Sequence, residues 1–199
     1  FKFPGLRALE SISPDGTRLV LTVNPFSSSD IMLATLGPPT EIRPLIQSAF
    51  VEYAPRISPD GRWIAFTSNE SGRNEVYVRP FPDVDQGRWQ VSTEGGLDPR
   101  WAKNGRELFF GSGGNAGSLS RWSSAIQPGA TFVAGKPTQI ATSPSEANAS
   151  FAYDVASDGR LLVHLAASRD TAAEASRPQL VVVQHWFDEL KARVPTAPR

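Results

Sequence analysis

The chain has 199 residues, of which 40% are hydrophobic, so it is long enough to bury the core of one or two ordinary domains. Its 20 lysine and arginine residues balance 20 aspartate and glutamate residues, and this zero net charge argues against a nucleic-acid binder, which normally carries a basic face. The lack of cysteine excludes disulfide bonds and thiolate metal sites.

The sequence contains no long apolar run of membrane-spanning length and no signal-peptide pattern at its start. It begins at Phe1 rather than at methionine. We therefore expect a piece of a longer protein, in which an anchor or a catalytic domain would lie upstream. These features leave the cellular compartment undecided.

The first predicted unit has an inner strand at residues 7–12, a Ser-Pro-Asp-Gly turn at 13–16 and a buried strand from Arg18 onward. Two further strands are predicted at 30–35 and 41–45. In the turn, proline presets φ near −65°, aspartate can bond its own backbone, and glycine accepts a positive φ.

The second unit is the most clearly marked. Its inner strand at 53–57 leads into a second Ser-Pro-Asp-Gly turn at 58–61, and strands are predicted at 75–79 and 88–91. Between them, Trp-Ile-Ala-Phe at 63–66 is apolar at successive positions rather than alternating. This pattern predicts a strand that is covered on both faces.

The third and fourth units keep the glycine of the turn but lose its proline. The fourth also lacks an outer strand, because its third strand runs directly into a different kind of segment. The strands predicted for these two units are residues 97–102, 107–110, 118–122, 138–141, 150–155, 161–164 and 179–183.

The turn residues recur at intervals of 45, 44 and 54 positions. A period in the forties with a glycine turn and short strands is typical of a β-propeller, with one four-stranded antiparallel blade per repeat. We predict an all-β fold in which residues 1–184 form about four blades. The unfinished last blade favours an arc of a larger ring, completed by upstream blades or by a second copy of the chain, over a closed four-bladed ring.

The last segment, residues 185–199, has a different pattern. Phe187, Leu190 and Val194 are spaced as an apolar stripe on one side of a helix, which Pro195 would end. We predict a short C-terminal helix and tail.

The glycines and their partners in the turns are predicted to form the blade corners. Aspartates that repeat in register suggest a ring of metal ligands, but the corners of separate blades are far apart, so bonding within each turn is the favoured interpretation. These structural turn residues are Asp15, Gly16, Asp60, Gly61, Asn104, Gly105, Asp158 and Gly159.

Candidate ligand-binding residues lie four positions before each turn residue, at Ser11, Arg56, Arg100 and Asp154. Inner strands of propellers line the central channel, and arginine suits the planar recognition of carboxylate or phosphate. We therefore predict a channel site made of Arg56, Arg100 and Asp154. The alternative is that the arginines pair with neighbouring acids such as Asp98 or Asp154.

Catalytic signatures are missing from this sequence. It has no Gly-x-Ser-x-Gly elbow, no phosphate-binding loop and no kinase catalytic segment, and its two histidines do not form a metal-binding spacing. We predict no catalytic residue, metal or cofactor. The five tryptophans suggest a sugar platform, but their positions on strands favour packing within or between blades.

The Ser-Pro-Asp-Gly turns and the following Trp-Ile-Ala-Phe-Thr-Ser resemble the TolB-like, or WD40-like PD40, propeller repeat, most closely at 12–23 and 57–68. Residues 180–191, Leu-Val-Val-Val-Gln-His-Trp-Phe-Asp-Glu-Leu-Lys, resemble the C-terminal tail of propeller regions attached to bacterial Ser/Thr protein kinases. This second resemblance implies an N-terminal kinase domain, often a membrane span, and a propeller outside the cytoplasm or in the periplasm that senses or binds.

Two functions remain open. In the first, the chain is a non-catalytic propeller segment that binds a protein, peptide or small ligand through its loops or channel, and that self-associates to complete the ring. In the second, it is the gating propeller of an enzyme such as a prolyl-oligopeptidase-like peptidase. That family places its hydrolase domain after the propeller, so the helix and proline-rich tail expected here favour the first function.

Overall fold

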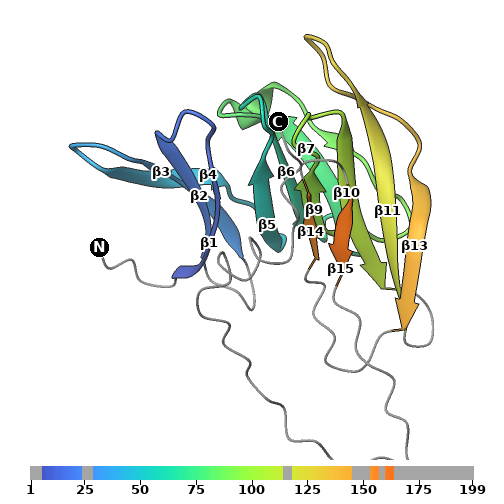
Figure 1. The fold of residues 1–199 in the computed structure, drawn as a ribbon. Helices are drawn as coiled ribbons and strands as arrows, with labels where there is room; N and C mark the ends of the chain where they lie inside the picture. Colours follow the sequence, from blue (N-terminus) through green and yellow to red (C-terminus); the bar gives the residue numbers. More distant parts are fainter. Residues whose placement is uncertain (1–5, 24–28, 114–117, 145–152, 157–159, 164–199) are drawn as a thin grey trace, which may run out of the picture. The chain divides into compact units, whose positions relative to one another are not determined.

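The computed structural model describes residues 6–23, 29–113, 118–144, 153–156 and 160–163 (Figure 1). Apart from one short turn of 3-10 helix, the regular structure in these ranges consists of β-strands. The strands form antiparallel sheets, and each sheet is made of consecutive segments of the chain. We refer to the sheets as blades A to D in chain order.

Blade A contains β1 (Leu6–Ile12), β2 (Arg18–Val23), β3 (Asp30–Thr35) and β4 (Glu41–Ile46), hydrogen-bonded in the order β1-β2-β3-β4. Blade B repeats this order with β5 (Glu52–Ile57), β6 (Trp63–Ser68), β7 (Glu75–Pro80) and the short β8 (Trp89–Gln90). A 3-10 turn, η1 (Val84–Gln86), precedes β8.

Blade C contains β9 (Leu97–Trp101), β10 (Glu107–Gly113) and the long β11 (Ser118–Gln127). Two strands pair with β11: β12 (Val133–Ala134) near its end and β13 (Thr138–Pro144) along its first half. The described part of blade D is a pair of short strands, β14 (Tyr153–Val155) and β15 (Leu161–Val163).

The corner turns have the same geometry in successive blades. In blade B, the Ser58 hydroxyl donates a hydrogen bond of 2.5 Å to Asp60 Oδ1, which also accepts one of 3.1 Å from the Arg62 backbone N–H. Gly16, Gly61 and Gly105 adopt φ of +70°, +71° and +68°, a region that favours glycine.

The turns of neighbouring blades also contact each other. A Cβ atom placed on Gly61 would lie 3.4 Å from Cδ of Pro14, and one on Gly105 would lie 4.0 Å from Cδ of Pro59. The proline of one turn therefore packs on the glycine of the next.

The hydrophobic core lies between blades. Strand β6 is buried at all six of its positions. Ile64 and Phe66 belong to a cluster shared with blade A, whereas Trp63 and Ala65 belong to a cluster shared with blade C. This confirms the prediction of a strand covered on both faces.

The predicted all-β fold with four-stranded antiparallel blades is confirmed. Among the described residues, no helix has the length and apolar character that a membrane span needs. Several predictions fall outside the described residues and stay predictions: Asp158, Gly159, residues 150–152, the strand at 179–183, the 184/185 boundary and the helix and tail at 185–199.

Candidate functional site

The first predicted arginine, Arg56, lies on the inner strand β5. Its Nη1 donates hydrogen bonds to Glu10 Oε2 at 2.6 Å and to the Glu10 carbonyl oxygen at 3.0 Å. The two side chains are 17% and 14% exposed. Arg56 therefore forms a largely buried ion pair across the boundary of blades A and B.

The second, Arg100 on β9, is held more loosely. Its Nη1 lies 3.6 Å from Asp98 Oδ1, longer than the 2.7–2.9 Å typical of a direct charged hydrogen bond. Burial lowers the pKa of Arg100, and the positive charge of Arg56 lowers it further. The two guanidinium groups therefore lie close enough to repel each other.

Tyr153 on β14 joins these groups. Its hydroxyl donates a hydrogen bond of 2.7 Å to the Asp98 carbonyl oxygen, and its ring centroid is 5.7 Å from Cζ of Arg100. Burial raises the pKa of Tyr153 well above its usual value, and the positive charge of Arg100 opposes this rise. The ring thus provides a flat, neutral wall beside the arginines.

Arg121 on β11 lies beside the same tyrosine, and it was not among the residues predicted from the sequence. Its side chain is only 2% exposed, and Cζ lies 5.2 Å from the Tyr153 ring centroid. Among the described residues the buried Nε has no hydrogen-bond partner, and Nη1 makes a long contact of 3.5 Å to the Ser120 carbonyl oxygen. Burial lowers the pKa of this guanidinium.

We call Arg56, Arg100, Arg121 and Tyr153 the arginine–tyrosine cluster. Of its three guanidinium groups, that of Arg56 pairs with Glu10 and that of Arg100 with Asp98, whereas Arg121 forms no ion pair with any described residue. Asp154 is exposed, and its carboxylate accepts a hydrogen bond of 2.8 Å from the Val155 backbone N–H. The structure thus brings Arg56 and Arg100 together and shows no ion pair between either of them and Asp154. The side chain of Ser11 instead accepts a bond from Ile57 N–H.

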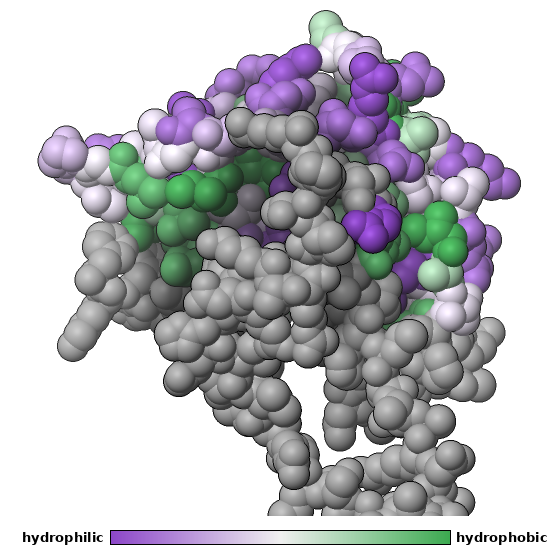
Figure 2. Space-filling view, viewed as in Figure 1, coloured by the Kyte–Doolittle hydropathy of each residue, from purple (hydrophilic) through white to green (hydrophobic). Residues whose placement is uncertain are grey.

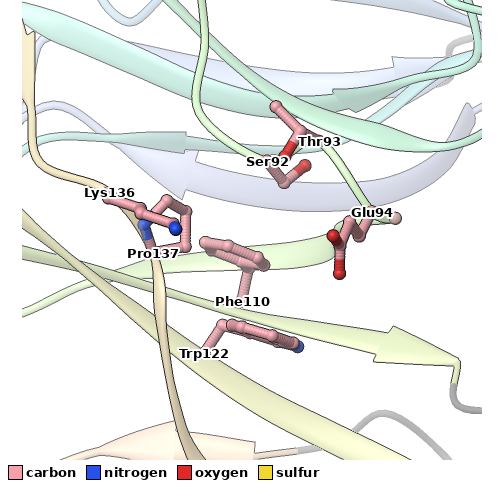
Figure 3. A pocket seen from close by; sticks show the side chains of 8 residues that line it. Ser92, Thr93, Glu94, Phe110, Trp122, Lys136 and Pro137 are labelled. Carbon is pink, nitrogen blue, oxygen red and sulfur yellow. The ribbon is translucent and has the colours of Figure 1, made fainter.

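A second candidate is a pocket of about 270 Å³ where the chain passes from blade B to blade C (Figure 3). Phe110 and Trp122 lie at its centre, with Lys136 on one side and Glu94 on the other. Trp122 is half-buried, and its Nε1 donates a hydrogen bond of 2.9 Å to Ser112 Oγ. The pocket combines aromatic surface with charges of opposite sign.

The other described tryptophans pack inside the core, as the sequence analysis favoured. Trp63, Trp89 and Trp101 surround Phe132, with ring centroids 5.3, 5.5 and 6.4 Å from its ring. Within the described ranges, no three His, Cys, Asp or Glu side chains gather as a metal site. His164, His185 and Trp186 lie outside these ranges.

Comparisons with known proteins identify the fold. No family model matches the sequence. A TolB-like protein from Agrobacterium tumefaciens has a TM-score of 0.62 at 18% identity, over 81% of this chain and 59% of that one. TolB from Acinetobacter baumannii has a TM-score of 0.56 at 18% identity, over 69% of this chain and 34% of that one.

The likeness extends to an enzyme. Oligopeptidase B from Trypanosoma brucei has a TM-score of 0.54 at 11% identity, over 70% of this chain and 21% of that one. At these identities the likeness concerns the fold alone. The chain has a TolB-like β-propeller fold, and it spans 59% or less of the length of these three structures.

Proposed function

We propose that this chain is a non-catalytic propeller segment that binds an anionic group of a protein, peptide or small ligand at the arginine–tyrosine cluster. The observation that supports this proposal is Arg121, a buried guanidinium whose Nε has no hydrogen-bond partner in the described ranges. Removing such a charge from water costs several kcal/mol unless it is paired and hydrogen-bonded. A bound anion would supply the pairing.

The chemistry of the cluster favours a carboxylate or a phosphate group. Guanidinium groups present planar pairs of N–H donors that match the two oxygens of such anions. Arg100 has the weaker protein contacts of the two predicted arginines, because its Nη1 lies 3.6 Å from Asp98 and donates a bond of 3.3 Å to the Pro99 carbonyl oxygen.

The test is calorimetric titration of the full chain with inorganic phosphate and with N-acetyl-trialanine, using its C-terminal amide as the uncharged comparison. We expect Arg100→Gln to weaken the binding of the anions about tenfold, because a hydrogen bond to a charged group contributes roughly 1.5–3 kcal/mol. The matched control is Arg106→Gln, whose side chain is exposed in the turn of blade C.

Equal affinities for the acid and the amide, or equal losses in the two variants, would contradict the proposal. Arg100→Gln should keep thermal stability within about 1 kcal/mol. Arg56 is less suitable for this test, because its removal leaves the carboxylate of Glu10 largely buried without its partner.

We infer in addition that the parent protein is larger and that its propeller lies outside the cytoplasm, with a bacterial Ser/Thr kinase as the favoured example. The resemblance of residues 180–191 to kinase-attached propeller tails supports this inference. The residues that precede Phe1 in the parent reading frame test it directly, because a kinase catalytic segment should be found there.

The alternative function is the gating propeller of a peptidase, which the likeness to oligopeptidase B favours. A hydrolase domain after this segment in the reading frame would support the alternative, and a kinase domain before it would exclude it.

A further inference from the structure

Two carboxylates are buried where the chain crosses from blade A to blade B. Asp30 is the first residue of β3, and Glu52 is the first residue of β5. The two residues are 8% and 3% exposed, respectively. The strand starts are joined by a backbone hydrogen bond of 2.8 Å from Glu52 N–H to the Ser29 carbonyl oxygen, and by a bond from the Ser29 hydroxyl to the Glu52 carbonyl oxygen.

The two carboxylates are close enough to interact. Burial raises the pKa of Glu52, the hydrogen bond from Ser48 opposes this rise, and the negative charge of Asp30 adds to it. The charge of Glu70, which is paired with Arg88 at 2.5 Å, acts in the same direction, whereas the positive charge of Arg79 opposes the rise without forming an ion pair with Glu52.

Two of the four carboxylate oxygens of Asp30 and Glu52 have no hydrogen-bond partner among the described residues. Asp30 Oδ2 accepts a hydrogen bond of 3.0 Å from Gln47 Nε2, and Glu52 Oε1 accepts one of 2.5 Å from the Ser48 hydroxyl. The other two oxygens, Asp30 Oδ1 and Glu52 Oε2, are buried and accept no hydrogen bond from the part of the chain that the structure describes. No ion pair between described residues includes either carboxylate. Buried anionic oxygens of this kind are costly unless a cation or a donor compensates them.

The corresponding corner of the next blade provides an internal comparison. Glu75 begins β7 as Asp30 begins β3, and each is paired with the last residue of the preceding strand. Glu75 is fully buried, yet both of its oxygens are satisfied. Oε1 accepts bonds from Arg73 Nε at 2.7 Å and from Gly95 N–H at 2.9 Å, and Oε2 accepts the Ser92 hydroxyl.

The counterpart of Glu52 in that corner is Gly96, since each lies eight positions before the turn residue of its unit. A Cβ atom on Gly96 would lie 2.2 Å from Ser92 Oγ, so no side chain fits there. The corner at Glu75 therefore contains one acidic side chain, and both of its oxygens accept hydrogen bonds. The other contains a second acid and two buried oxygens without partners.

From this difference we propose that Asp30 and Glu52 bind a hard divalent cation, with Ca²⁺ as the best fit, and that the ion fastens the connection between blades A and B. Oxygen ligands are those that Ca²⁺ prefers, and its flexible coordination accepts hydroxyl, carbonyl and water oxygens beside two carboxylates. Because only two carboxylates contribute, we expect weak binding, with a Kd of about 10⁻⁴–10⁻³ M. This proposal does not depend on the anion site.

The test is thermal unfolding of the full chain after removal of divalent ions, with CaCl₂ at about ten times the expected Kd compared with NaCl of equal ionic strength. We expect Ca²⁺ to raise the Tm of the natural sequence by roughly 3 °C, because an ion that binds the folded state alone stabilises it by mass action. Asp30→Asn and Glu52→Gln should each abolish this rise.

The two variants should also be at least as stable as the natural sequence when no divalent ion is present, since each removes a buried negative charge. Loss of the response in a folded, stable variant therefore cannot be ascribed to unfolding. The matched control is Asp83→Asn, because this carboxylate is exposed just before η1 and makes no capping hydrogen bond there. It should keep the full response.

Three results would overturn the proposal: no rise in Tm with Ca²⁺ for the natural sequence, a rise that persists in both variants, or a rise that Asp83→Asn also loses. Calorimetric titration with CaCl₂ gives an independent measure of the same binding, and a flat titration at the concentrations above would count equally against it.

Discussion

The aspartate of the first corner acts through hydrogen bonds within its own turn. Asp15 Oδ1 accepts a bond of 2.5 Å from the Ser13 hydroxyl and one of 3.0 Å from the Thr17 backbone N–H. These bonds, that of Ser13 first, lower the pKa of Asp15 from 3.8 to about 2. The pKa falls because hydrogen bonds to the charged form of a carboxyl group favour its ionisation. The Asp15 carboxylate therefore stabilises the turn in which it lies.

A prediction at this scale concerns the titration of Asp15. Because the pKa of the folded state is depressed, the stabilisation is present above pH 3.8 and is lost as the pH falls through about 2. Titration followed by NMR should give a midpoint near 2 for Asp15, and Ser13→Ala should raise this midpoint toward the ordinary value. Ser71→Ala, in the β6–β7 loop, should leave it unchanged. A midpoint that Ser13→Ala does not move would show that the Ser13 bond is unimportant.

At the scale of the element, β6 determines how blades A, B and C fit together. Its residues alternate between the two inter-blade clusters, so neither face of this strand meets water. A buried aromatic side chain contributes both transfer free energy and packing, and its truncation leaves a cavity that the surroundings fill only partly.

We expect Phe66→Ala, at a position 2% exposed, to lower the free energy of unfolding by about 3–5 kcal/mol. The control is Ile140→Ala on β13, where the side chain is 44% exposed and the expected loss is about 0.5 kcal/mol or less. Urea denaturation followed by tryptophan fluorescence measures both. Similar losses for the two variants would refute the double coverage of β6.

The strands could be predicted wherever apolar periodicity and turn residues agree. The third strand of blade A was predicted at 30–35, where β3 lies. In blade C, β11 continues to Gln127 and pairs with β12, and neither feature was predicted. The continuation contains Ser123 and Ser124, which are buried and hydrogen-bonded within blade C to Glu107 and Gly135, although their residue type gives no apolar signal.

Part of the candidate site could be predicted in the same way. Arg56 and Arg100 follow from their register before the turns, whereas Arg121 and Tyr153 come together only because blades C and D pack against each other. The sequence gives little signal for Arg121, because only Leu119 of the two alternate neighbours on its face of β11 is apolar, and the burial of Ser123 is visible in the structure alone.

At the scale of the molecule, one apolar cluster of blade A contains no residue of another blade among the described residues. Leu21, Val23 and Ala34 pack there with three further side chains of the same blade. Figure 2 shows apolar side chains gathered over the strands of this blade. Its edge strand β1 carries Leu9 and Ile12, which are 65% and 55% exposed. An exposed apolar edge is a ready site for pairing with another chain.

We therefore expect the chain to self-associate through blade A. Light scattering coupled to size exclusion should show a molecular mass that rises with protein concentration. The double variant Leu9→Ser, Ile12→Ser should suppress the rise, whereas Val133→Ser, at a position 42% exposed in blade C, should not. A natural sequence that remains monomeric at every concentration would contradict this expectation.

The packing of Pro14 on Gly61, and of Pro59 on Gly105, has a consequence for how such an array can grow. Within one corner motif, the proline contacts the motif of the following blade and the glycine contacts the motif of the preceding blade. Among the described residues, no proline contacts Gly16 of the first motif. The third motif has Lys103 at the position of the proline. Of the described motifs, only that of blade B therefore takes part in both contacts. Blade B is accordingly the natural module to duplicate in engineering a longer array, because each inserted copy would accept a proline from its predecessor and present one to its successor.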